Sequence, residues 1–457
     1  MVKDFKIENV FVFIALIFGL LYVLILPPFQ SVDEGMHFFR TYQISMGHLM
    51  AKNTNGKIGD ILPKDLASFY NRYTPLIKHI DKKSSITNIK NELRLKLNKD
   101  NTTYIEFTNT ALYSPTCYIS QLPGVILAKA LNLPLGIIFY LGRISNLIFY
   151  CLMIYCALKI TPFFKTPMML LALMPMSLSL AGAYTSDVMV FGLNFIFFAM
   201  ILKLLVNNDK YIQNLLIMAI LGFLIALTKS YILLLPLIFL IPSRNFKNLK
   251  RYWIFITSFL LSAIAGAMIW SMTSKGLNLN MNTYVTNVDA QKMFILTHPF
   301  NYIWIMIKTF FVKMPRLYVT MIGVLGWQDT PLDWITYMIY PILIYFGINN
   351  EAFNFKLQNW QKWVIIATII LGIVLTYTSL YIMWSPVKNP IILGLNGKYF
   401  IPLMLPFLLL FKNSSTKFNN HKLQLIIIIA TIFILISSDL SLIHRFYDMT
   451  PQLYYNI

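Results

Sequence analysis

The sequence has 457 residues, of which 57% are hydrophobic and only 12% are charged, and its mean hydropathy is +0.63. This composition excludes an ordinary soluble domain and predicts an all-α integral membrane protein with several spans. The formal net charge of +20 does not indicate a nucleic-acid partner, because most Lys and Arg residues lie in short segments between apolar runs, where they set membrane topology.

The first apolar run covers residues 9–26 and follows Lys3 and Lys6. Bulky residues precede Pro27, where a signal peptide would need a small-residue cleavage site, so we expect an uncleaved first membrane span. The flanking lysines predict a cytoplasmic N-terminus, which puts the segment after Pro27 outside the cell.

Residues 28–134 are predicted to form one large external loop with juxtamembrane helices. Residues 31–110 are polar and rich in Lys and Asn, and loops longer than about 60 residues escape the positive-inside rule. A strand is expected at residues 103–107. Residues 113–131 are moderately apolar but contain Pro115, Gln121, Pro123 and Lys129, which favours an interfacial helix over a span.

Ten further apolar runs follow, and with the first run they predict about 11 transmembrane helices in a single domain, residues 1–457, with an external C-terminus. Each loop that this alternation places in the cytoplasm is basic, as the positive-inside rule requires. Three runs are shorter than the roughly 20 residues that cross hydrocarbon unaided, namely 231–241, 399–411 and 423–436. The first two could instead be buried short helices that face other protein around a site. The other seven are residues 135–158, 167–184, 188–206, 211–227, 252–270, 332–348 and 363–384.

Residues 271–331 are predicted to form a second large external loop. This segment is polar at first and then aromatic and basic (HPFNYIWIMIKTFFVKMPR), which indicates an interfacial or re-entrant helix.

The densest group of polar residues begins directly after the first span. A helix would place Asp33, His37 and Arg40 on one face, at i, i+4 and i+7, with Glu34 beside them. Two interpretations are open: the acids form a functional site at the membrane edge, or they complement the dipole of a helix N-terminus.

Ser31 and Glu34 have the spacing of a capping box, which predicts a helix from near residue 32 to residue 47. In that arrangement Glu34 caps the helix, and Asp33 is the acid presented to a groove, oriented by His37 and Arg40.

Three ionisable residues are predicted to lie near membrane depth on the external side: Arg143, Asp187 and Lys229. Such residues are costly there and often mark a substrate or ion pathway. Asp187 could instead lie in a plain hairpin turn, Lys229 could snorkel to the interface, and Arg143 could be the structural partner of a loop acid.

Cysteine usage and short motifs argue against several other active sites. The three cysteines show no Cys-x-x-Cys or Cys/His spacing, so neither a zinc site nor a disulfide framework is indicated. There is no GxxxxGK[ST] motif for ATP-driven transport and no GxSxG motif of a serine hydrolase. We expect no cofactor and no metal, although one or two carboxylates could hold a divalent ion.

Several stretches together resemble the GT-C superfamily of membrane glycosyltransferases. They are SVDEGMHFFR, ALYSPTCYISQLPGV, GRISNL, TSDVMV and LTKSY. More closely, PPFQSVDEGMHFFRTYQISMGHL, IGVLGWQDT and GLNGKYFIPLMLP resemble a bacterial family of predicted polytopic membrane proteins of unknown function that is considered GT-C-like. The resemblance extends from Pro27 to about Pro406. It departs at Lys398, where the family pattern has Arg, and at Gln328, where it has an aliphatic residue.

The resemblance implies roles for particular residues. Asp33, with Glu34 as the runner-up, would act as general base or position the acceptor, and Asp187 would be the second-loop acid. Basic groups that hold the donor phosphate map onto Arg143, Lys229 or Lys398, although Lys lacks the bidentate geometry of Arg. The remaining expected substrate-binding residues are His37, Arg40, Tyr113, Tyr231, Trp327, Asp329 and Tyr399.

The implied activity is transfer of a sugar from a polyprenyl-phosphate donor to a cell-surface glycan acceptor, on the external face of a bacterial plasma membrane. The alternatives are a transporter or lipid-linked glycan flippase, a glycan polymerase or ligase, and a non-enzymatic membrane scaffold. No internal repeat is visible, which disfavours the transporter.

Overall fold

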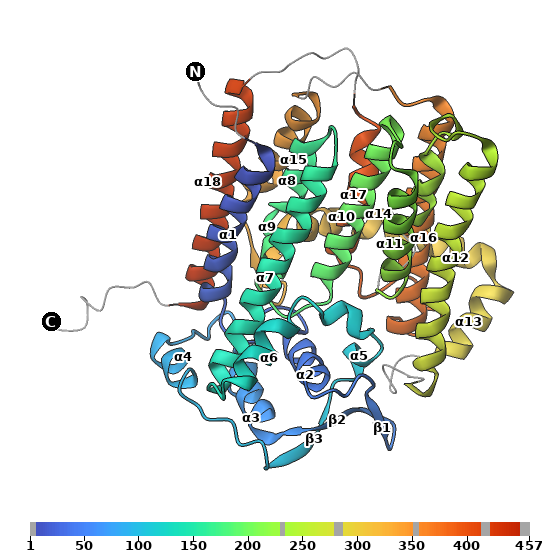
Figure 1. Ribbon diagram of the computed structural model, residues 1–457. Helices are drawn as coiled ribbons and strands as arrows, with labels where there is room; N and C mark the ends of the chain where they lie inside the picture. The colour runs from blue at the N-terminus through green and yellow to red at the C-terminus, as the bar shows by residue number, and fades with distance from the viewer. Residues whose placement is uncertain (1–5, 229–233, 278–286, 351–355, 413–420, 448–457) are drawn as a thin grey trace.

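The computed structural model describes residues 6–228, 234–277, 287–350, 356–412 and 421–447. A helical bundle carries a compact polar region at one end (Figure 1). Six of the described helices are long and apolar enough to cross a membrane, and the count of about 11 spans remains a prediction. The six are α1 (Ile7–Ile25), α7 (Leu135–Ile160), α10 (Asp187–Val206), α12 (Leu249–Thr273), α16 (Asn359–Trp384) and α18 (His421–Phe446).

The polar region, which we call the cap, comprises residues 28–134. Its three-stranded antiparallel sheet has the order β1-β2-β3, and the predicted strand at residues 103–107 is confirmed as β3. Asn55 and Gly56 form the β1–β2 turn, both with positive φ, as an Asn-Gly hairpin turn requires. The cap elements are α2 (Glu34–Ser45), β1 (Lys52–Thr54), β2 (Lys57–Pro63), α3 (Lys64–Tyr73), η1 (Thr74–Leu76), α4 (Ile86–Glu92), β3 (Thr102–Glu106), α5 (Thr108–Ala111), η2 (Pro115–Tyr118) and α6 (Leu122–Ala130).

An aromatic cluster fixes the cap to the bundle. Phe29 packs against Phe69 of the cap and against Phe139 of α7, with ring centroids 4.9 and 4.7 Å apart. Phe38 and Tyr184 join the same cluster, at 5.1 Å from each other. These rings are buried, so their apolar surface stabilises the junction of cap and bundle.

Two of the predicted spans are not single membrane-length helices. Residues 167–184 form α8 (Lys165–Ala172) and α9 (Pro175–Ala181), because Pro175 cannot continue the hydrogen bonding of α8 and starts a new helix. Residues 399–411 form η6 (Gly397–Phe400) and the short, largely buried α17 (Ile401–Leu409). Part of the predicted run 231–241 lies outside the described residues, and its remainder contains the 3₁₀-helix η3 (Leu235–Leu240).

The span predicted at residues 423–436 corresponds to α18, but the predicted bounds are too short, since α18 has 26 residues and continues to Phe446. Ser437, Ser438 and Asp439 end the apolar run in the sequence, but the helix continues through them. Ser438 and Asp439 are buried, and the Ser438 hydroxyl hydrogen-bonds to the Tyr22 hydroxyl of α1. A polar group that faces another helix is compatible with a span, although it shortens the hydropathy signal.

The second predicted loop contains α13 (Val288–Thr297) and the 25-residue α14 (Pro299–Gly323). Helix α14 packs against η6 and α9 and is followed by the short ribbon β4 (Val324–Leu325) and β5 (Thr330–Pro331). The remaining helices are α11 (Tyr211–Ala226), α15 (Trp334–Asn349) and the one-turn η4 (Ser243–Asn245) and η5 (Lys275–Leu277).

The basic loops gather at the end of the bundle opposite the cap. Lys165 is 3.2 Å from Glu8 in the first turn of α1, and Lys412 donates to the carbonyl of Ile348. At the other end, Lys83 of the cap donates to the carbonyl of His444, near the end of α18. The described basic loops therefore lie at one end of the bundle, while the number of crossings and the orientation in the membrane remain predictions.

Candidate functional site

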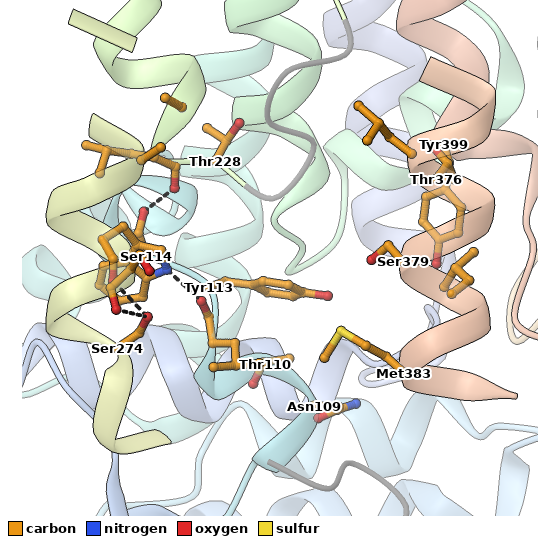
Figure 2. A pocket seen from close by; sticks show the side chains of 18 of the residues that line it. Asn109, Thr110, Tyr113, Ser114, Thr228, Ser274, Thr376, Ser379, Met383 and Tyr399 are labelled. Carbon is orange, nitrogen blue, oxygen red and sulfur yellow. Dashed lines mark hydrogen bonds between the residues drawn. The ribbon is translucent and has the colours of Figure 1, made fainter. Parts of the chain in front are cut away.

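A cavity of about 420 Å³ lies between the cap and helices α11, α12 and α16. Figure 2 shows Ser114 and Ser274 on one wall and Thr376, Ser379 and Met383 on the other, with Tyr113 projecting between them. Its volume is within the range of small-molecule sites. The described lining residues are Asp33, His37, Asn109, Thr110, Leu112, Tyr113, Ser114, Ala226, Leu227, Thr228, Ala267, Trp270, Ser271, Ser274, Leu375, Thr376, Ser379, Leu380, Met383, Trp384 and Tyr399.

Asp33 is the carboxylate in this lining. It has φ +60 and precedes α2, but its side chain makes no capping hydrogen bond; instead Asn109 Nδ2 donates to Asp33 Oδ1 at 3.1 Å. Asp tolerates this left-handed backbone better than most residues. Burial, and secondarily the charge of Asp33, raise the pKa of Tyr70 in the cap.

The expected capping box is wrong. Helix α2 begins at Glu34 and ends at Ser45, and the Glu34 side chain does not turn back to the helix start. It pairs with Arg143 of α7 and accepts a hydrogen bond from the backbone N–H of Tyr184. The cause is tertiary: the buried Arg143 supplies two charged donors, a stronger partner than a backbone N–H.

Arg143 is fully committed to this structural role. Its Nε and Nη2 donate to the two Glu34 oxygens at 2.8 and 2.7 Å, and its other donors reach the carbonyls of Val23, Leu26 and Pro27. The alternative of a loop-acid partner is confirmed for Arg143. Glu34 and Arg143 are completely buried and do not line the cavity.

His37 lies one helical turn after Asp33 and lines the cavity. Its Nδ1 is 3.0 Å from the hydroxyl of Tyr118, and its ring stacks on Tyr113 with centroids 5.9 Å apart. The predicted common face is therefore formed by Asp33 and His37, whereas Arg40 is buried elsewhere. Arg40 donates to Gln43 and to the carbonyls of Leu49 and of the lining residue Tyr113, and burial lowers its pKa.

Two hydrogen bonds hold the cap segment that forms one wall. Ser114 Oγ donates to the carbonyl of Leu227 at 2.6 Å, and Trp270 Nε1 donates to the carbonyl of Leu112 at 2.9 Å. The cavity wall is therefore shared between the cap and helices α11 and α12.

Asp187 and Lys398 form an ion pair with each other. Asp187 is the first residue of α10 and Lys398 belongs to η6, and their charged atoms are 2.7 Å apart. Neither residue is in the lining, but Tyr399, which follows Lys398, is. The ion pair is therefore next to a lining residue in the sequence, although neither of its members lines the cavity.

Trp327 and Asp329 lie away from the cavity. Trp327 Nε1 donates to the carbonyl of Phe29 at 2.9 Å, and Asp329 pairs with Arg445 of α18 at 2.7 Å. Both contacts connect the turn after α14 to other parts of the molecule. The predicted site residues Lys229 and Tyr231 lie outside the described residues.

Sequence reasoning named Tyr113 and Tyr399 but missed the serine and threonine residues of the lining. Two sets of lining residues have the spacing of one helix face, which could have marked them: Thr376, Ser379 and Met383 on α16, and Ala267, Trp270, Ser271 and Ser274 at the end of α12. Thr110 carries no such signal. Within the described part of the chain, no three His, Cys, Asp or Glu side chains gather as metal ligands.

The cavity combines a carboxylate, an imidazole, hydroxyl groups and aromatic rings. A carboxylate or imidazole can accept a proton, and hydroxyls and rings can hold a polar ligand that has apolar faces. These features define a polytopic, mainly helical membrane protein with a capped cavity whose lining is largely apolar and contains a few polar groups.

The chain belongs to the family described as "Predicted membrane protein (DUF2142)", whose model matches residues 16–408. Neither the search of curated proteins nor the search of solved structures returned a significant match.

Proposed function

We propose that the protein is a membrane glycosyltransferase that transfers a sugar from a polyprenyl-phosphate donor to a cell-surface glycan on the external face of a bacterial plasma membrane. The observation that supports this proposal best is the placement of Asp33 in a cavity between the cap and the membrane helices. A lipid-linked donor could remain in the bilayer while its sugar enters such a cavity.

In the proposed reaction an acceptor hydroxyl attacks the anomeric carbon of the donor sugar. The bond from that carbon to the phosphate oxygen breaks, and polyprenyl phosphate leaves with the bonding electrons. Asp33 accepts the proton of the attacking hydroxyl, and Asn109, which donates to Asp33, keeps the carboxylate in position. Attack opposite the departing phosphate inverts the anomeric centre.

The remaining lining fits a sugar. Serine and threonine hydroxyls can hydrogen-bond to sugar hydroxyls, and Tyr113, Trp270 and Tyr399 offer aromatic faces for the apolar face of a sugar ring. His37 is the imidazole of the site and is held by Tyr118.

The departing phosphate requires positive charge nearby. We assign this role to Lys398, which precedes the lining residue Tyr399, and to Lys229, which follows the lining residue Thr228. Asp187 would position Lys398 through their ion pair. Arg143 is left out of the donor site because its donors are used within the protein.

The test compares Asp33→Asn with Asp81→Asn, an exposed acid of the cap that is outside this lining. Each purified variant is incubated with labelled polyprenyl-phosphate sugars and membrane glycan. We expect Asp33→Asn to lower transfer by at least about 100-fold, the usual contribution of a general base, with Asp81→Asn unaffected.

Two results would contradict the proposal. Normal transfer by Asp33→Asn would show that Asp33 is not the general base. Movement of a lipid-linked sugar across vesicle membranes without any transfer would instead support the flippase or transporter alternative.

A further inference from the structure

A second polar cavity, of about 470 Å³, lies at the end of the bundle opposite the cap. It is formed by the loop between α10 and α11, by η4 and by the start of α12. Its lining side chains include Lys210, Lys247 and Arg251 and one acid, Asp209, whose carboxylate accepts a hydrogen bond from Asn207. The cavity therefore has an excess of positive charge.

Contacts within the protein hold this cavity in shape. The Arg251 guanidinium lies over the Tyr211 ring, 5.4 Å from its centroid, and the Tyr211 hydroxyl donates to the Arg251 carbonyl at 3.0 Å. Asn245 fixes η4 to the end of α10 by donating to the carbonyl of Leu204 at 2.7 Å. The cationic groups thus surround a site with an ordered frame.

One lining residue, Asn208, has a buried hydrogen-bond donor without a partner among the described residues. Asn208 is 9% exposed, and its Oδ1 accepts from Asn214, but its Nδ2 has no hydrogen-bond partner among the described residues. A buried donor without a partner costs free energy that an anionic oxygen would recover.

We propose that this cavity binds a phosphate group, and that the phosphate belongs to an anionic phospholipid headgroup. Lys210, Lys247 and Arg251 would neutralise the phosphate, and the Asn208 amide would donate to one of its oxygens. Basic pockets between membrane helices are suited to such headgroups.

The surface next to the cavity favours a lipid over free phosphate. Ile212 lines the cavity and is 72% exposed, and Leu216 and Ile220 continue from it along α11 at i+4 and i+8, 56% and 59% exposed. This spacing places the three side chains in one apolar stripe that starts at the basic cavity. An acyl chain would follow the stripe while the headgroup occupies the cavity.

The test measures lipid retention by the purified full-length protein with native mass spectrometry. Phosphatidylglycerol is compared with phosphatidylcholine and with inorganic phosphate for the wild type and for Lys210→Ala, Lys247→Ala and Arg251→Ala. Arg244→Ala and Lys250→Ala are matched controls, since these basic residues lie on the same segments but outside the lining.

We expect the wild type and both controls to prefer phosphatidylglycerol, and each cavity variant to lose about fivefold in affinity for it. Lys210 and Lys247 are exposed, so replacing either by Ala should leave folding unchanged, and a loss of lipid binding in these variants can be attributed to the site. Equal losses in control and cavity variants would overturn the site. Retention of inorganic phosphate without any preference for phosphatidylglycerol would overturn the lipid as its source.

Discussion

At the scale of single residues, two adjacent acids have different surroundings. Asp33 faces a cavity with one described hydrogen-bond partner, Asn109, whereas Glu34 is fully buried against Arg143. A buried ion pair contributes little net stability compared with an apolar pair, but removing one partner leaves a charge that is costly to bury. Substitutions at the two positions should therefore differ in kind: a substitution of Asp33 should lower the proposed transfer activity, and a substitution of Glu34 should lower stability.

Replacing Arg143 by Leu should destabilise the protein by about 3–5 kcal/mol, because Glu34 would remain buried without its cation. Thermal unfolding in detergent measures this loss. Lys292→Ala is the control, since Lys292 and Asp289 are exposed and 4.0 Å apart, and it should leave the midpoint unchanged. An Arg143→Leu protein as stable as the wild type would show that this ion pair does not hold α2 to α7.

Acid should weaken the cap through Asp60. Burial alone would raise the pKa of its carboxyl, but hydrogen bonds from Gln43, the Ile61 N–H, His48 and Lys52 outweigh burial and lower the pKa below the usual value. The folded state therefore binds this proton less readily than the unfolded state. The resulting stabilisation is present above about pH 4 and is lost as the pH falls through the folded-state pKa.

The measurement is the stability of the cap between about pH 7 and pH 3, in the wild type and in Asp60→Asn. The variant should be less stable by roughly 1–3 kcal/mol at neutral pH and should show a smaller further loss in acid. An identical acid dependence in both proteins would exclude Asp60 as the responsible group.

At the scale of elements, prolines and close contacts between backbones decide whether an apolar run forms one long helix or several short ones. Pro175 divides one predicted span into α8 and α9. In another, the 3₁₀-helix η6 directly precedes the short helix α17. Gly397 in η6 lies so close to α14 that a Cβ built on it would be 2.0 Å from the carbonyl oxygen of Leu317. This close approach sets the position of η6, and with it Lys398 and Tyr399.

Gly397→Ala should push η6 away from α14 and cost about 1–3 kcal/mol, the usual cost of overpacking. It should also lower any activity of the cavity, because Tyr399 would move with η6. Thermal unfolding and the transfer assay check these two effects. Gly182→Ala is the matched control, since its Cβ would meet its nearest neighbour at 3.2 Å, and a larger effect there than at Gly397 would contradict the argument.

At the scale of the whole molecule, distant segments converge where the cap meets the bundle. Arg445 at the end of α18 pairs with Asp329 after α14 and donates to the carbonyls of Leu76 and Lys82 in the cap. Trp327 adds a hydrogen bond to Phe29. The cap is therefore fixed by α18 and by the turn after α14, in addition to its covalent connections to α1 and α7.

Arg445→Ala should loosen the cap around residues 77–83, because it removes two carbonyl contacts and leaves Asp329 without its cation. Limited trypsin digestion should cleave after Lys82 or Lys83 at least about tenfold faster than in the wild type. His444→Ala, at the preceding position, should digest at the wild-type rate. Unchanged cleavage in Arg445→Ala would show that the cap does not depend on α18.

The sequence by itself determined the class of protein, the alternation of basic loops and the strand β3, because hydropathy, charge and period-two patterns are local properties. It favoured Asp33 over Glu34 as the acid that faces a groove, but it did so on a capping box that the structure does not form. Their partners are 76 residues away for Asp33 (Asn109) and 109 residues away for Glu34 (Arg143), so only tertiary packing shows which acid is neutralised within the protein and which faces the cavity. The same reason applies to Arg143 and Asp329. The sequence marked both as site candidates, but their ion-pair partners lie on helices distant in the sequence, so only the tertiary structure shows that both are paired within the protein.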